Sequence, residues 1–464
     1  MNWEKLLNNN RLRQSNRKNP EDARNDFESD FGRIIFSPAL RRMHDKTQVF
    51  PLTTDDNIHS RLTHSMEVMS VGYSLGVQLC ENEEFRTRIG RDKYDLFREI
   101  PMIVKNICLI HDIGNPPFGH FGETVIQNYF KDFFSKCSFP DKKQKNSQKL
   151  DLNEEQRFEF LNFDGNAQGL RVLTKLQILN DAFGLNLTFA TLAAYIKYPN
   201  YEKINDKIIE QHKIGIFYSE REYFEKIISE CELKVGDRVI RHPLCYLMEA
   251  ADSICYLTMD MEDGYNMGLY DLNYLYNKLK DIPSIKEKIE KIYQDPENYY
   301  KNDITKVVNF RIQIIQQLVV LAVKNFEVNL SLIETGGYNK ELIEDDETNK
   351  LAEILRSVCK EKIFTYRDIN SLEITGHSVI GGLLDYYIKF VFHTDKKYRK
   401  RASALISNSI LNAAFEENNL IGNDAKIDNL SDYYKLKIIV DFVSGMTDQY
   451  ALNHYQKISG QKIN

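Results

Sequence analysis

The sequence predicts an all-α, mainly helical fold with at most short edge strands. In three segments, apolar residues recur every three or four positions, as they do on one face of a helix. Strand-like patterns are confined to residues 212–219 and 235–242. A chain of 464 residues is long enough to bury a large helical core.

The first two helices are marked by where their apolar faces begin and end. One follows His64, and its apolar face comprises Val68, Val71, Leu75 and Leu79. A second helix leads up to His111 and should stop at Gly114, because two prolines follow directly. Its apolar face comprises Ile103, Ile107 and Ile110.

A third helix is expected from about Pro243 to Glu262, with Gly264 ending it. Helical patterns also cover six later segments: 275–293, 303–334, 350–362, 372–394, 401–416 and 432–456. Two polar stretches, 139–156 and 334–350, have the composition of surface insertions. Neither is a convincing linker, so a single domain over residues 1–464 is expected.

Composition narrows the class of protein. Hydrophobic residues make up 42% and charged residues 28%, the balance of a folded soluble protein. The net charge is −6, so any polyanion site must depend on a local basic patch. The seven cysteines form no CxxC pair, which indicates reduced thiols. The amino terminus has no apolar signal segment, and we expect a cytoplasmic protein without a membrane span.

Two histidines and two aspartates near the ends or faces of these helices form a candidate metal site: His64, His111, Asp112 and Asp252. Imidazole and carboxylate ligands suit Mn²⁺, Co²⁺, Ni²⁺ or Fe²⁺, and Mg²⁺ is a further candidate. Four protein ligands leave an octahedral ion open to water and substrate. The alternative is that His111 and Asp112 only cap a helix.

Eight segments, in order along the chain, resemble the deoxyguanosinetriphosphate triphosphohydrolase (dGTPase) family of HD-domain metal-dependent phosphohydrolases. They are FGRIIFSPALRRMHDKTQVFPL, RLTHSMEV, HDIGNPPFGHFGE, NFDGNAQGLRVL, AAYIKYP, HKIGIFYSE, EAADSICYLTMDMEDG and DFVSGMTDQYAL. The resemblance runs from about residue 25 to residue 455. It implies an HD-type helical domain that hydrolyses a dNTP to deoxynucleoside and inorganic triphosphate.

His120 and Glu123 lie three residues apart after the sequence PPFG, on one face of any helix that starts there. A carboxylate bonded to an imidazole fixes its tautomer and suits proton transfer. The resemblance implies that His120 is the acid or base and Glu123 orients it. Alternatively, Glu123 is a carboxylate favoured by the helix N-terminus.

The resemblance also implies a deoxyribose site. Asp252, Tyr256 and Asp260 follow one helix flank at intervals of four. Asp260 would bond the 3′-hydroxyl together with Gln48, while Val49 would crowd the 2′ carbon. The acidic surroundings leave open that Asp260 is merely a solvated carboxylate.

For the triphosphate, the resemblance indicates Arg61 near the α-phosphate, with Lys197 and Lys213 further along. Tyr198 and Asn166 are additional candidates. Cationic side chains are the natural partners of phosphate oxygens.

The resemblance also implies that Glu373 recognises the base, since it occupies the region where the family places a carboxylate, which can accept both N1–H and the 2-amino group of guanine. The aromatic residue over the sugar is either Phe364 or Tyr366, of which Tyr366 matches the family's usual residue type. Arg33, Arg41 and Arg42 precede the site and could serve the nucleotide or a subunit contact.

The family commonly forms rings, often hexamers, and some members bind single-stranded DNA, so a homo-oligomer is expected. Two other functions stay open at this point. One is another HD phosphohydrolase, such as a nucleotidase or phosphodiesterase. The other is a nucleotide-sensing or DNA-binding regulator, which would have no use for a general acid.

Overall fold

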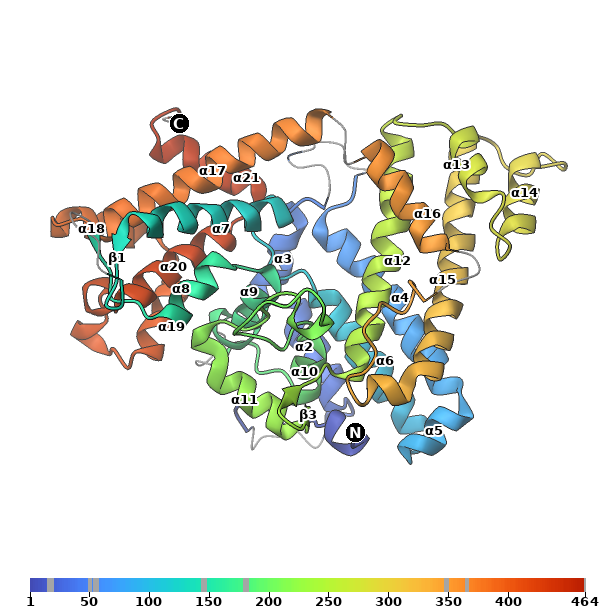
Figure 1. Ribbon diagram of the computed structural model, residues 1–464, viewed down its shortest axis with the longest axis horizontal. Coiled ribbons are helices and arrows are strands. Elements are labelled where there is room, and N and C mark those ends of the chain that lie inside the picture. Colours follow the sequence, from blue (N-terminus) through green and yellow to red (C-terminus); the bar gives the residue numbers. More distant parts are fainter. Residues whose placement is uncertain are drawn as a thin grey trace.

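Helices dominate the computed structural model (Figure 1), as the sequence predicts. It describes residues 1–14, 21–48, 52, 58–142, 148–177, 183–345, 350–363 and 367–462. Within these ranges the strands form two short pairs. β1 (Cys137–Ser138) pairs in parallel with β2 (Gln148–Lys149), and β3 (Lys234–Val235) pairs antiparallel with β4 (Arg238–Val239).

Several connections between consecutive α-helices are long, and the longest runs from Tyr195 to Arg221. The first group is α1 (Trp3–Leu6), α2 (Asp26–Ile35), α3 (Pro38–Arg42), α4 (Arg61–Glu81), α5 (Glu83–Ile89), α6 (Lys93–Ile110) and α7 (Gly119–Ser135). The second group is α8 (Glu154–Leu161), α9 (Gly165–Arg171), α10 (Phe189–Tyr195), α11 (Arg221–Glu230), α12 (Pro243–Asn266), α13 (Leu272–Leu279), α14 (Lys286–Gln294) and α15 (Asp303–Ile333). The last group is α16 (Leu351–Val358), α17 (Arg367–Val391), α18 (Lys396–Leu405), α19 (Asn408–Glu417), α20 (Asp432–Ser444) and α21 (Asp448–Ile458).

The expected helix after His64 and the one before His111 are present as α4 and α6. The prediction that Gly264 ends the third helix is wrong, because α12 continues to Asn266. Gly264 lies inside this helix, where an added Cβ would come within 2.9 Å of the Tyr270 hydroxyl. The glycine therefore permits a close side-chain contact rather than a helix end.

Three of the expected long helices are each interrupted. Pro283, which lacks an N–H, lies between α13 and α14. Ser407 precedes α19, and Thr447 caps α21 by accepting a hydrogen bond from the Tyr450 amide. The segment 350–362 is α16 followed by the π-helical turn η5 (Cys359–Ile363).

The expected strand at 212–219 is not formed. Its Gly215 amide donates to the Asn200 carbonyl at 2.9 Å, so the segment packs against a loop and has no strand beside it. The second expected stretch, 235–242, contributes to the β3–β4 pair. The insertion 139–156 contains β2 and the start of α8, and its residues 143–147 lie outside the described part, as do 346–349 of the other insertion.

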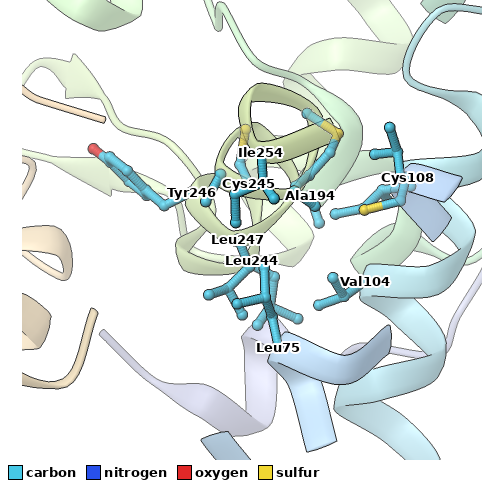
Figure 2. Packing of buried hydrophobic residues seen from close by; sticks show 14 of the residues in the cluster. Leu75, Val104, Cys108, Ala194, Leu244, Cys245, Tyr246, Leu247 and Ile254 are labelled. Carbon is cyan, nitrogen blue, oxygen red and sulfur yellow. The ribbon is translucent and has the colours of Figure 1, made fainter. Parts of the chain in front are cut away.

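The buried apolar residues form two large clusters. The first lies among α4, α6, α10, α12 and α15, where Figure 2 shows Leu75, Val104, Leu244 and Ile254 converging. The second is built around α7, α17 and α20, and α17 runs along α7 in Figure 1. All seven cysteines are buried free thiols, as expected. By length and composition alone α15 could cross a membrane, but here it packs on α12 and α4.

The α4–α6 contact positions His64 against His111 and depends on small residues. An added Cβ on Gly76 would lie 2.8 Å from Cα of Pro101, a backbone atom that cannot move aside easily. We therefore expect Gly76→Ala to lower the free energy of unfolding by about 1–3 kcal/mol, measured by urea denaturation. Gly381→Ala, in α17, is the control: no neighbour lies within 4 Å of its added Cβ, and the helix should be unchanged or slightly more stable. Equal losses in both variants would contradict this account of the contact.

Candidate active site

Three of the four expected metal ligands converge from three helices. His64 comes from the first turn of α4, His111 directly follows α6, and Asp252 lies on the inner face of α12. Nε2 of His64 is 3.0 Å from Oδ1 of Asp252, and Nε2 of His111 is 3.3 Å from the same oxygen. One ligand atom from each of the three lies within 4.8 Å of the others.

The two imidazoles are held so that Nε2 points into the cluster. Nδ1 of His111 is 2.7 Å from the Cys108 carbonyl, which fixes the proton on that nitrogen. Its Nε2 is buried and makes no hydrogen bond with the described residues. Two imidazole nitrogens and a carboxylate oxygen this close together are a donor set that fits a divalent cation.

The charge of this cluster is unbalanced without a cation. Burial lowers the pKa of His111, but the carboxylates of Asp112 and Asp252 outweigh burial and raise the pKa to about 9. Burial would raise the pKa of Asp252, yet His111 and His64 hold it well below its usual range. The carboxylates therefore attract positive charge to this place, whether a proton or a metal ion supplies it.

Asp112 lies beside this cluster and is not part of it. Its Oδ2 pairs with Arg61 Nη1, and its Oδ1 accepts a hydrogen bond from the Asn115 side chain at 2.7 Å. Oδ1 is 3.7 Å from Nε2 of His111. Burial would raise the pKa of Asp112, but Arg61 and His111 lower it to about 2. Metal ligation by Asp112 stays a prediction.

A tight turn places the expected dyad next to Arg61. Phe118 and Gly119 both have positive φ, 61° and 58°, and an added Cβ on Gly119 would lie 2.2 Å from Arg61 Nη2. Helix α7 starts at Gly119, so His120 and Glu123 share its first turns. Glycine at 119 thus lets the guanidinium lie directly against the turn.

Within the dyad, Nδ1 of His120 is 2.9 Å from Oε2 of Glu123, and Oε1 of Glu123 accepts the Gly165 amide at 2.7 Å. Glu123 is buried, whereas the His120 side chain is 72% exposed and so accessible to a ligand. The hydrogen bond to Glu123 raises the pKa of His120. Burial would raise the pKa of Glu123, but His120 and Lys213 lower it.

Lys213 reaches this dyad from a loop. Its Nζ is 2.9 Å from Oδ2 of Asp164 and 3.9 Å from Oε2 of Glu123. The side chain of Asn166 donates to the other oxygen of Asp164 at 2.8 Å. Burial lowers the pKa of Lys213, but Asp164 and Glu123 outweigh it, so the amine is charged beside His120.

Lys197 lies in the loop directly after α10, and its Nζ pairs with Oε1 of Glu249 at 3.1 Å. Arg241 also pairs with Glu249, at 3.0 Å, and donates to the Lys197 carbonyl. Lys197 Nζ lies 5.6 Å from the centre of the Tyr198 ring. Because Arg241 already balances Glu249, Lys197 has positive charge available to a ligand.

The expected sugar site lies further along α12. Tyr256 accepts a hydrogen bond from Arg356 Nε at 3.1 Å, and Arg356 also pairs with Glu341 and Glu344. Asp260 is buried one turn further on. Burial, reinforced by the carboxylate of Asp263, raises the pKa of Asp260 to about 8, so this carboxyl is protonated at neutral pH.

The structure gives fewer contacts for the remaining residues predicted to bind the sugar and the base. Oε1 of Gln48 is buried and makes no hydrogen bond within the described part of the chain, which leaves an acceptor for a ligand. Glu373 is half-buried on α17. Val49, Phe364 and Tyr366 lie outside the described residues.

Sequence reasoning missed Arg356 and Asn115. Arg356 contacts Tyr256 across 100 residues of sequence, and nothing in its local pattern indicates this. Asn115 orients Asp112 and stands within the motif HDIGN, so its position in that string was the available signal.

Comparisons with known proteins agree with this geometry. Converging histidines and carboxylates on a helical scaffold are the arrangement expected of an HD-type phosphohydrolase. No protein-family model matches the chain. The chain is 35% identical to the deoxyguanosinetriphosphate triphosphohydrolase-like protein of Listeria innocua, over 99% of this chain and 100% of that protein. It is 30% identical to the protein of the same name in Synechocystis, over 99% of each. It is 32% identical to the deoxyguanosinetriphosphate triphosphohydrolase of Enterobacter sp. (strain 638), over 93% of each. The chain belongs to the deoxyguanosinetriphosphate triphosphohydrolase family.

The His120–Glu123 contact can be tested without any substrate. We expect Glu123→Gln to lower the pKa of His120 towards its ordinary value of 6.5, because the variant removes the carboxylate that raises it. The measurement is a pH titration of the His120 ring resonances by NMR. Thr124→Ala, on the exposed side of the same helix, should leave this pKa unchanged. An unaltered pKa in Glu123→Gln would show that the two side chains do not interact in solution.

Proposed function

We propose that the protein hydrolyses dGTP at the α-phosphorus, releasing deoxyguanosine and inorganic triphosphate. The observation that carries the proposal is the convergence of His64, His111 and Asp252 beside an accessible His120–Glu123 dyad. Family membership supports dGTPase-type hydrolysis, and the names of the similar proteins suggest the substrate. A pure nucleotide sensor would not need the dyad.

The ligands proposed to hold a divalent metal ion are His64, His111, Asp252 and, after turning from Arg61, Asp112. Mn²⁺ and Mg²⁺ are the first candidates, with Co²⁺, Ni²⁺ and Fe²⁺ as alternatives. Such an ion would polarise the α-phosphoryl oxygen and lower the pKa of a bound water.

The chain's own residues would complete the chemistry. Release of Asp112 frees the Arg61 guanidinium for the α-phosphate, since that carboxylate is its partner in the absence of ligand. His120, oriented by Glu123, moves the proton at the reacting oxygen. Lys213 and Lys197, with Tyr198 and Asn166, neutralise and position the rest of the triphosphate.

The sugar and base would lie along α12 and α17. The protonated Asp260 can both donate to and accept from the 3′-hydroxyl, and Gln48 would offer its free side-chain oxygen as a second acceptor. Arg356 would orient Tyr256 towards the sugar. Glu373 would accept from the guanine edge, with Val49 and Tyr366 completing the pocket.

We further propose that the protein works in the cytoplasm as a homo-oligomer. Supporting this, α15 exposes apolar residues that a subunit contact could cover, including Val320 and Val328. Binding of single-stranded DNA is a further property to examine, given that some family members show it.

The decisive experiment is phosphorus NMR of dGTP incubated with the protein and Mn²⁺. Inorganic triphosphate should be the only phosphorus product, and His64→Ala should slow its formation at least about 100-fold, because a ligand is lost. His44→Ala is the matched control, since this histidine is exposed and bonds only to Asp45 among the described residues; its rate should match the wild type. Orthophosphate or pyrophosphate instead would favour another HD phosphohydrolase. Intact dGTP with every metal tried would favour a regulator.

Guanine preference tests the role of Glu373 separately. A hydrogen bond to a charged group contributes about 1.5–3 kcal/mol, so Glu373→Gln should reduce the ratio of kcat/KM for dGTP over dATP by about 10- to 100-fold. The turnover number with dGTP at saturation should change much less. An unchanged ratio would place base recognition on another residue.

A further inference from the structure

A cavity of about 350 Å³ lies beside the HD motif, with Ile113 and Gly114 in its wall. Its walls come from α3, from α9 with the π-helical turn η2 (Val172–Leu176), from α19, and from the junction of α20 and α21. Gly114, two residues after Asp112, forms part of the wall. At the outer edge, Ser409 and Tyr450 are exposed, so the cavity opens to solvent there.

Two basic side chains, Arg42 and Lys46, face this cavity. Arg42 is half-buried and forms no ion pair or hydrogen bond with the described residues, and burial together with Arg41 lowers its pKa. Lys46 is 4% exposed and donates to the carbonyls of Asn115 at 2.5 Å and Ser444 at 2.9 Å. Burial and the neighbouring Arg42 lower the pKa of Lys46 to about 7, although the carboxylates of Asp448 and Asp112 act in the opposite direction.

The one carboxylate among the lining residues is already engaged. Asp441 accepts from Arg171 Nε at 2.8 Å and from the Gln168 side chain at 3.0 Å. Asp441 therefore does not balance Arg42, and a bound anion would offset the cost of burying this guanidinium.

Gln168 supplies a second feature that points to a ligand. It lines the cavity, is only 2% exposed, and its Oε1 makes no hydrogen bond with any described residue. An N–H group of a ligand would satisfy this oxygen. Most of the other lining side chains are apolar, among them Val172 and Leu176, and suit a ring or hydrocarbon body.

We propose that this cavity binds a small organic phosphate whose phosphate group contacts Arg42 and Lys46. A guanidinium matches phosphate oxygens two at a time, and an ammonium adds a point charge. The volume lies within the range of small-molecule sites. The apolar wall holds the organic part, and Gln168 accepts a hydrogen bond from it.

The site is structurally connected to the metal cluster. Lys46 holds the Asn115 carbonyl, and the Asn115 side chain donates to Asp112 Oδ1 at 2.7 Å. Asn115 thus links Lys46, at the proposed phosphate position, to Asp112 through two hydrogen bonds. Binding itself does not depend on the proposed hydrolysis.

The test is photolabelling of the full-length protein with 8-azidoadenosine monophosphate, followed by peptide mass spectrometry. We expect label on tryptic peptides 402–426 and 438–457, which carry Ser409 and Tyr450. Arg42→Gln should raise the half-saturating concentration for these peptides at least tenfold. Arg41→Gln, its exposed neighbour on the same helix, should leave it unchanged. Inorganic phosphate should compete, whereas adenosine should compete much more weakly.

Ser409→Trp serves as a second variant if Arg42→Gln does not fold, because it blocks the exposed edge without altering a buried residue. It should abolish label on both peptides while leaving the thermal unfolding midpoint unchanged. Label confined to peptides of the metal site, equal loss in the two arginine variants, or competition by adenosine as strong as by the phosphate would overturn the proposal. The outcome is separate from that of the dGTP experiment, since no turnover is measured.

Discussion

The carboxylate of Asp252 between two imidazoles is the interaction on which the site depends. Its Oδ1 lies 3.0 Å from Nε2 of His64 and 3.3 Å from Nε2 of His111, so it joins α12 to α4 and to the end of α6. Those three helices also form the centre of the larger hydrophobic cluster. The packing of these helices therefore forms the core and also positions the ligands. The glycines that bring α4 close to α6 contribute to both.

A chain of charge pairs leads from this cluster to the rest of the site. Asp112 engages Arg61, Arg61 lies against the turn at Gly119, and that turn starts the helix carrying His120 and Glu123. Asp112, Arg61 and Glu123 are all largely buried, so a change of partner at one of them alters the electrostatics at the next. Under the proposed function, Asp112 would exchange Arg61 for a metal ion, which would couple cation binding to phosphate binding.

Sequence reasoning predicted the helical class, the α4 and α6 helices and the residues that converge in the site. The periodicity of the apolar residues and the order of the motifs carry that information, because the ligands must lie on buried helix faces. Helix interruptions at Pro283, Ser407 and Thr447 were missed, since the apolar spacing continues across them. Gly264 was misassigned because a glycine that ends a helix and one that admits a neighbouring tyrosine look the same in sequence. Arg356 could not be found, as its partner Tyr256 lies 100 residues away and is near only in the folded chain.

The most direct test of this account is a crystal of the protein soaked in Mn²⁺, with anomalous diffraction recorded at the manganese edge. The account predicts one strong peak bonded to Nε2 of His64, Nε2 of His111 and an oxygen of Asp252, with Asp112 turned from Arg61 to complete the set. A peak elsewhere, or no peak while His64 and His111 keep their positions around Asp252, would contradict the assignment of this cluster as a metal centre.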